Sequence, residues 1–148
     1  MNTVRPWLMI GKYRESMDRN LLAQCEIGAM LHLAEDVSHP DMTCLYLPVE
    51  DGVPIPVDLL AQGVAFILAQ RDQEKKVFVA CGAGMSRSVS FAVAALKEAE
   101  KLDLLTALRI VKQHHPEALP NPKLWQSLCS YYNEPIPLSQ MIHIINTA

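Results

Sequence analysis

The chain has 148 residues, half of them hydrophobic, and its 13 basic and 16 acidic side chains give a formal net charge of −3 at pH 7. This length accommodates one compact domain with a sizeable core and is short for two domains. No run of five or more basic residues occurs, so the sequence does not predict a surface for DNA or another polyanion.

The cysteines and the hydrophobic stretches indicate a protein of the cytoplasm. The cysteines are widely spaced, include no Cys-x-x-Cys pair and follow no secretory signal; they are Cys25, Cys44, Cys81 and Cys129. This spacing favours free thiols in a reducing compartment. Because Asp58, Gln62 and Arg71 interrupt the most hydrophobic region, no apolar run approaches the about 18 residues that a membrane span needs.

The first half of the chain is predicted to supply three short strands and one short helix. Apolar segments at 7–10, 29–33 and 44–49 end in turn or loop residues, as strands do. The composition of 17–25 is that of a short helix. His32 lies in the second strand, where a single histidine is more typical of a hydrogen-bonded core residue than of a metal or substrate ligand.

A helix, a strand and a second helix are predicted next. Apolar residues at helical spacing predict a helix over 56–71, with Pro56 in its first turn. The short run 77–80 is rich in β-branched residues and predicts a buried strand. The small and apolar residues that follow it predict a central helix over 88–99, packed on several sides.

Two further helices and an apolar tail complete the chain. Asp103 is suited to cap a helix over 103–114, and Asn121 with Pro122 is suited to begin another. The tail 135–148 is too apolar for a freely solvated end. Packing on its own domain is favoured over a surface for a partner or for a second copy in a homodimer.

The loop between 77–80 and 88–99 concentrates the chemistry of the sequence. Gly82 and Gly84 allow the backbone to turn successive N–H groups toward one concavity, and the following helix adds free amides and its positive dipole end. Cys81 opens the loop and Arg87 closes it, so a thiol and a guanidinium would face the same oxyanion. The pattern suggests a thiolate nucleophile opposite a phosphate. A buried structural cysteine is the alternative for Cys81 alone.

A second candidate group follows the strand 44–49. Glu50 and Asp51 project from the carboxyl end of this strand, which is the edge where ligands bind in open α/β sheets. A solvated loop carboxylate is the plain alternative for either residue.

The segment Cys81-Gly82-Ala83-Gly84-Met85-Ser86-Arg87-Ser88 resembles the signature loop of the dual-specificity branch of the protein tyrosine phosphatases. The resemblance extends over roughly 5–132 and leaves the tail 135–148 outside. It implies one phosphatase-like α/β domain over 1–148, with a core of about 5–132. That domain is expected to contain a central, mostly parallel sheet of about four or five strands flanked by helices.

The resemblance also implies a phosphomonoester hydrolase that forms a phosphocysteine. Cys81 would be the nucleophile, Asp51 the general acid and later the base, and Ser88 a donor to the departing thiolate; Glu50 is the second choice as acid. The phosphate would be held by Gly82, Ala83, Gly84, Met85, Ser86 and Arg87. No metal or cofactor is expected, and the partner would be a phosphorylated protein or a small phosphomonoester.

One departure from the family pattern keeps other functions open. The family has histidine immediately before its nucleophilic cysteine, and this chain has Ala80 there. A phosphate-binding pseudophosphatase that recognises phosphorylated partners is therefore the first alternative, and a rhodanese-like sulfurtransferase is the second. Since Arg87 is the loop's only cation, a phosphotyrosine or phosphoserine/threonine monoester is favoured over polyphosphorylated ligands.

Overall fold

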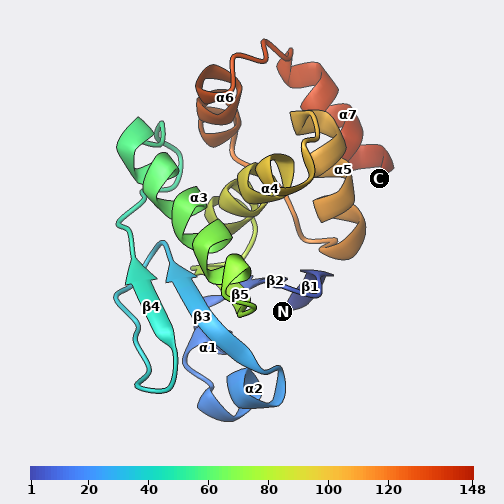
Figure 1. Ribbon diagram of the computed structural model, residues 1–148. Helices are drawn as coiled ribbons and strands as arrows, with labels where there is room; N and C mark the ends of the chain where they lie inside the picture. The colour runs from blue at the N-terminus through green and yellow to red at the C-terminus, as the bar shows by residue number, and fades with distance from the viewer.

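A five-stranded sheet forms the centre of the computed structural model, which describes residues 1–148 (Figure 1). Its strands lie in the order β1-β2-β5-β3-β4, and only β1 runs antiparallel to its neighbour. The strands are β1 (Asn2–Arg5), β2 (Leu8–Lys12), β3 (Ile27–His32), β4 (Thr43–Tyr46) and β5 (Lys76–Cys81). This architecture confirms the single-domain α/β fold with a mostly parallel sheet.

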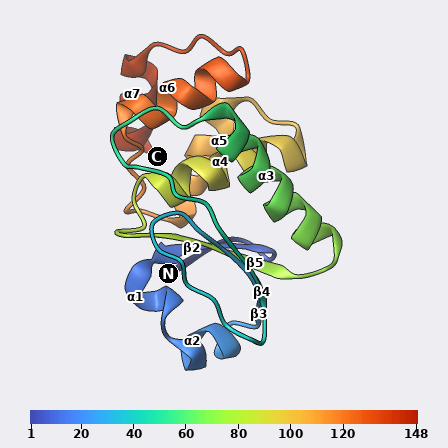
Figure 2. The same ribbon diagram turned by 90° about the vertical axis from the view of Figure 1, so that its left-hand side faces the viewer.

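Helices cover both faces of this sheet, with α1 and α2 on one side and α3 to α7 on the other (Figure 2). They are α1 (Tyr13–Ser16), α2 (Arg19–Gln24), α3 (Val57–Asp72), α4 (Arg87–Glu100), α5 (Leu104–His114), α6 (Pro122–Tyr131) and α7 (Leu138–Thr147). No helix has both the length and the apolar character that crossing a lipid bilayer requires.

The helix caps agree with the sequence signals. The Asp103 carboxylate accepts a hydrogen bond from the Thr106 N–H at 2.7 Å, and the Asn121 side-chain oxygen accepts one from the Lys123 N–H at 2.8 Å. Each bond satisfies a backbone donor that the first helical turn leaves without a partner. These local interactions explain why α5 and α6 begin within a residue of their predicted positions.

The N-terminal region differs most from the expectation. The strand β1 was not predicted, because in its sequence Asn-Thr-Val-Arg only Val4 is buried and no apolar run marks it. It forms as an edge strand that pairs with β2. The short helix α1 was also not predicted. The strand predicted over 44–49 ends earlier, because β4 stops at Tyr46. The Leu47 and Val49 N–H groups still donate hydrogen bonds to the carbonyls of His32, the last residue of β3, and of Leu33.

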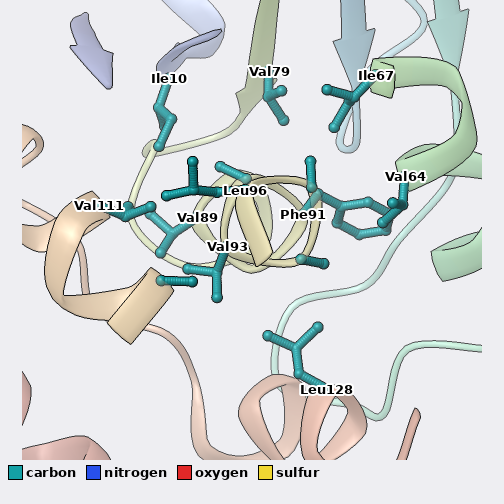
Figure 3. Packing of buried hydrophobic residues seen from close by; sticks show 14 of the residues in the cluster. Ile10, Val64, Ile67, Val79, Val89, Phe91, Val93, Leu96, Val111 and Leu128 are labelled. Atoms are coloured by element: carbon teal, nitrogen blue, oxygen red, sulfur yellow. The ribbon is translucent and has the colours of Figure 1, made fainter. Parts of the chain in front are cut away.

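The helix α4 lies at the centre of the core. Nine consecutive residues, from Ser88 to Leu96, are buried. Figure 3 shows Ile10 and Val79 of the sheet on one side of this helix, Val64 and Ile67 of α3 on another, and Val111 of α5 and Leu128 of α6 around the rest. The loop that begins this helix is therefore attached to the most enclosed element of the molecule.

The apolar tail forms α7 and packs on its own domain, chiefly against α5. Met141 and Ile144 are only 2% and 4% exposed and belong to the main hydrophobic cluster. The remaining apolar residues of α7 lie nearer the surface, and Ile142 is 46% exposed. One edge of α7 is thus anchored in the core while another is exposed to solvent.

His32 is a hydrogen-bonded core residue, as its position predicted. The ring Nδ1 accepts hydrogen bonds from the backbone N–H groups of Ala34 at 3.2 Å and Glu35 at 3.0 Å. Nε2 therefore carries the proton in the neutral ring, and it lies 3.1 Å from the Ser16 hydroxyl oxygen. Burial, with a further contribution from the Arg87 charge, lowers the pKa of His32 from 6.5 to about 4.

This shift predicts acid lability. Between pH 6.5 and about 4 the unfolded chain protonates His32 while the folded protein does not, so the free energy of unfolding falls as the pH falls. The expected loss from this residue is about 2–3 kcal/mol by pH 4.5. Urea denaturation at pH 7 and pH 4.5 measures it.

The control for this prediction is His32→Asn, whose amide oxygen can still accept from the backbone but does not titrate. The variant should lose about 2–3 kcal/mol less than the wild type between the two pH values. Equal losses in both proteins would show that other groups determine the acid sensitivity.

Candidate active site

The loop between β5 and α4 turns sharply because two residues lack side chains. Gly84 has φ of +70°, a conformation that favours glycine, and a Cβ atom there would lie 3.0 Å from the Gly11 carbonyl. A Cβ atom on Gly82 would lie 3.2 Å from Nη2 of Arg87. The guanidinium therefore folds back over the start of the loop, so that both ends of the loop border one space.

Cys81 is the last residue of β5 and only 2% of its surface is exposed. Its Sγ lies 3.2 Å from the hydroxyl oxygen of Ser88 in the first turn of α4. If Cys81 is a thiolate, the Ser88 hydroxyl is the donor in this contact, because a thiolate only accepts. Ser88 is itself fully buried, so its hydroxyl has a fixed position beside the sulfur.

Arg87 connects the loop to the strand edge that carries the candidate acids. Its Nη1 donates a hydrogen bond to the carbonyl oxygen of Val49 at 3.1 Å. Val49 immediately precedes Glu50 and Asp51, so one guanidinium touches both the loop and the acid-bearing segment. This bond uses one of five N–H donors and leaves others free for a ligand.

Asp51 borders the same pocket as Cys81 and Arg87, whereas Glu50 does not. Glu50 instead lines a neighbouring depression that Asp51 and Arg87 share. Farther along this loop, the Ile55 N–H donates to the Ser127 hydroxyl of α6 at 2.9 Å, which ties the loop to the helical layer. Of the two candidate acids, only Asp51 shares a pocket with Cys81.

The C-terminal half of the loop is held by the segment between α5 and α6. The Asn121 N–H donates to the Ser86 hydroxyl at 2.8 Å, and the Leu119 N–H donates to the Met85 carbonyl at 2.8 Å. Within α4, the Ser90 hydroxyl donates to the Ser86 carbonyl at 2.8 Å. These bonds fix the loop from outside its own sequence.

His115 holds the middle of the loop, and the sequence pattern did not identify it. It is only 2% exposed, and its Nε2 lies 2.6 Å from the Gly84 carbonyl oxygen, so Nε2 must carry the proton and donate. Its Nδ1 lies 2.6 Å from the Asn2 side-chain oxygen in β1. A signal was present, because position 115 continues the buried stripe of Leu108 and Val111 on α5.

His115→Phe is expected to lower kcat/KM on p-nitrophenyl phosphate about tenfold, since it removes one hydrogen bond that fixes the loop and leaves a buried carbonyl without its donor. His115→Gln, which keeps an N–H donor, should restore part of the loss. His115→Phe should also alter the pH dependence of Cys81 alkylation by iodoacetamide. A role of His115 in folding alone would leave that pH dependence unchanged.

The neighbouring His114 provides the matched control. It is exposed, and its Nδ1 contacts only the Ile110 carbonyl of its own helix. His114→Phe should leave kcat/KM and the alkylation profile unchanged. If both phenylalanine variants behave alike, His115 does not position the loop.

Ala80 is fully buried on the sheet face that α1 and α2 cover, in a cluster with Phe78 and Met30. In the sheet register its partner on β3 is His32. The bonds of the His32 ring go to its own turn and to Ser16, so it supplies no hydrogen bond to the loop. Neither Ala80 nor His32 therefore gives the loop the hydrogen bond that a histidine at position 80 could donate.

The structure contains no group of three or more His, Cys, Asp or Glu side chains arranged to hold a metal ion. The four cysteines are all free thiols.

The parallel sheet, the central helix and the cysteine-to-arginine loop between them define the fold of the cysteine-based protein tyrosine phosphatases. Within that class, residues 8–134 match the family model described as "Dual specificity phosphatase, catalytic domain". The chain belongs to this family.

Individual relatives agree with the family match. The chain is 24% identical to Dual specificity protein phosphatase 19 of Mus musculus over 135 residues, which cover 88% of this chain and 61% of that protein. It is 33% identical to Dual specificity protein phosphatase 22-B of Danio rerio, with 82% and 68% covered. The chain thus spans less than two thirds of the mouse protein.

Solved structures show the same fold. The crystal structure of human DUSP28 superposes with a TM-score of 0.83 at 26% identity, covering 90% of this chain and 96% of the human one. The similarity of fold and family supports a phosphatase function for the chain.

Proposed function

We propose that the chain is an active phosphatase that hydrolyses phosphotyrosine or phosphoserine/threonine monoesters through a phosphocysteine intermediate. The observation that carries this proposal is the meeting of Cys81, Arg87 and Asp51 around one pocket, with the Cys81 Sγ 3.2 Å from the Ser88 hydroxyl. A nucleophile, an anion-binding fork and a carboxylic acid are the three groups that phosphoryl transfer to a thiol needs.

In the first step, the Cys81 thiolate attacks phosphorus. The S–P bond forms as the ester P–O bond breaks, and Asp51 gives its proton to the leaving oxygen. Arg87 and the loop amides hold the other phosphate oxygens while their charge redistributes. The products are a phosphocysteine and the free alcohol or phenol.

In the second step, water attacks the phosphocysteine and Asp51 takes one of its protons. The S–P bond breaks, inorganic phosphate leaves, and the sulfur departs as a thiolate that the Ser88 hydroxyl stabilises by donating a hydrogen bond. Water is the only other reactant, and Asp51 returns to its starting protonation state.

The direct test is hydrolysis of p-nitrophenyl phosphate, with vanadate as inhibitor. Wild-type protein should turn over this ester, and enzyme quenched in acid during turnover should carry phosphate on Cys81. Turnover without phosphate on Cys81 would contradict the covalent mechanism.

A second candidate function rests on Ala80. Ala80 brings no polar group to the loop and the His32 ring makes its hydrogen bonds elsewhere, so neither residue helps Arg87, Ser88, the loop amides and the helix dipole to stabilise a thiolate. A phosphate-binding pseudophosphatase would bind tungstate or a phosphopeptide without turnover. The family match gives no support to the sulfurtransferase alternative, which a thiosulfate-to-cyanide assay would detect.

The compartment follows from the proposed chemistry. A cysteine nucleophile works only as a reduced thiolate, so a reducing compartment such as the cytoplasm suits this mechanism. Because Arg87 is the only cationic side chain that lines the pocket, a substrate with a single phosphate is favoured.

A further inference from the structure

The pocket that contains Cys81 extends well beyond the space around the sulfur. Its volume of about 480 Å³ lies in the range of pockets that bind drug-sized ligands. One wall is the loop from Cys81 to Arg87, together with Asp51. Another part of the lining comes from α7, through Met141, Ile142, Ile145 and Asn146. Figure 2 shows this helix on the same side of the molecule as the loop between β5 and α4.

Most of the side chains that line this extension are apolar, with Asn121 and Asn146 as the polar ones, and several of the apolar side chains are open to solvent. Only seven large hydrophobic residues of the chain are exposed, and three of them border this pocket: Met85 (38%), Leu119 (50%) and Ile142 (46%). Exposed apolar side chains that gather in one depression are typical of a binding site, whereas single ones scattered over a surface are not.

The apolar wall has a fixed position. Met141 and Ile144 anchor α7 in the main core, so Ile142 and Ile145 are presented by a helix that is packed on α5. Leu119 is held on the other side by the bond from its N–H to the Met85 carbonyl. A ligand would therefore find a preformed surface.

The charges in the pocket define the rest of the ligand. Arg87 is the only cation and Asp51 the only anion among the lining residues. One phosphate satisfies Arg87, and a second anionic group would find no cation and would face the Asp51 carboxylate. The part of the ligand that reaches α7 is therefore not a second anion, and Met141, Ile142 and Ile145 of that helix favour an apolar group there.

We propose that the groove between the Cys81 loop and α7 is a substrate subsite for a large apolar side chain next to the phosphorylated residue of a phosphopeptide. The proposal rests on the function proposed above, because the phosphate must occupy the loop for its neighbour to reach α7. Ile142 and Leu119 are the specificity-determining residues, and burial of the peptide's apolar side chain between them supplies the selectivity.

The test compares two phosphotyrosine peptides that differ only in the residues on both sides of the phosphotyrosine, leucine in one and serine in the other. Wild-type protein should hydrolyse the leucine peptide with a kcat/KM about 5- to 20-fold higher, mainly through a lower KM. Ile142→Ser should reduce this ratio severalfold while hydrolysis of p-nitrophenyl phosphate is unchanged. Leu119→Ser should also reduce the ratio. Both positions are about half exposed, so neither change should unfold the protein.

His143→Ser is the matched control, because His143 is the exposed neighbour of Ile142 on α7 and lies outside the pocket. It should keep the full preference for the leucine peptide. Equal kcat/KM for the two peptides in wild-type protein would overturn the subsite. A preference for 2-naphthyl over phenyl phosphate without any preference between the peptides would overturn the phosphopeptide assignment in favour of a small aryl ester.

The subsite and the proposed function can fail separately. Turnover of p-nitrophenyl phosphate reports the function alone, whereas the ratio between the peptides reports the subsite. If no variant turns over any ester, the affinities of Cys81→Ser for the two peptides, measured by calorimetry, still test the subsite. Tighter binding of the leucine peptide would support it, and equal affinities would exclude it.

Discussion

Replacing Cys81 with serine is expected to lower the hydrolysis of p-nitrophenyl phosphate by at least about 10⁴-fold. A serine hydroxyl at position 81 is a much weaker nucleophile than a thiolate, and the other hydroxyl that lines the pocket, that of Ser86, is held by a hydrogen bond from the Asn121 N–H. Binding of tungstate should persist, because Arg87 and the loop backbone remain. Tungstate should therefore still raise the melting temperature of the variant.

Cys44→Ser is the control for this change, since Cys44 is also a free thiol but lies on β4 and does not line the pocket. Its activity should match that of the wild type. Hydrolysis by Cys81→Ser at a rate near the wild-type value would exclude the covalent mechanism.

Asp51→Asn is expected to lower kcat/KM on phosphoserine peptides by about 10²- to 10⁴-fold. An alkoxide is a poor leaving group and needs the proton that asparagine cannot supply. The p-nitrophenolate ion leaves readily without a proton, so the loss on p-nitrophenyl phosphate should be smaller. The measurement is the ratio of kcat/KM for the two substrates in wild type and variant.

Glu50→Gln tests the choice between the two neighbouring carboxylates. Of these two carboxylates, Asp51 alone lines the pocket that contains Cys81. Glu50→Gln should therefore keep a nearly wild-type ratio of kcat/KM between the phosphoserine peptide and p-nitrophenyl phosphate. If Glu50→Gln shows the leaving-group-dependent loss and Asp51→Asn does not, the acid has been assigned to the wrong residue.

The loop could be predicted from the sequence because its parts are adjacent in the chain. Cys81, the glycines and Arg87 lie within seven residues, and their order after a β-branched run already indicates a strand, a turn and a helix start. The caps at Asp103 and Asn121 are equally local, and the structure contains both. Hydrophobic patterns and capping residues thus located most of the helices and strands.

The contacts that complete the site join distant residues, and no local pattern encodes them. Arg87 and Val49 are 38 residues apart, and His115 and Gly84 are 31 apart. The apolar composition of 135–148 indicated that the tail would dock, but only the packing of α7 shows that it borders the same pocket as Cys81. The strand β1 escaped prediction because hydrogen bonds to β2 stabilise it more than burial does.

The enclosure of α4 determines how the protein can open. The buried residues of α4 contact the sheet and three other helices. The backbone N–H groups of α4 can therefore exchange their hydrogens with solvent only when most of the domain unfolds. The first turn of that helix carries Arg87 and Ser88, and the Cys81 loop therefore belongs to the same cooperative unit as the core. Core substitutions around α4 would then reduce the fraction of folded molecules rather than loosen the loop in those that remain folded.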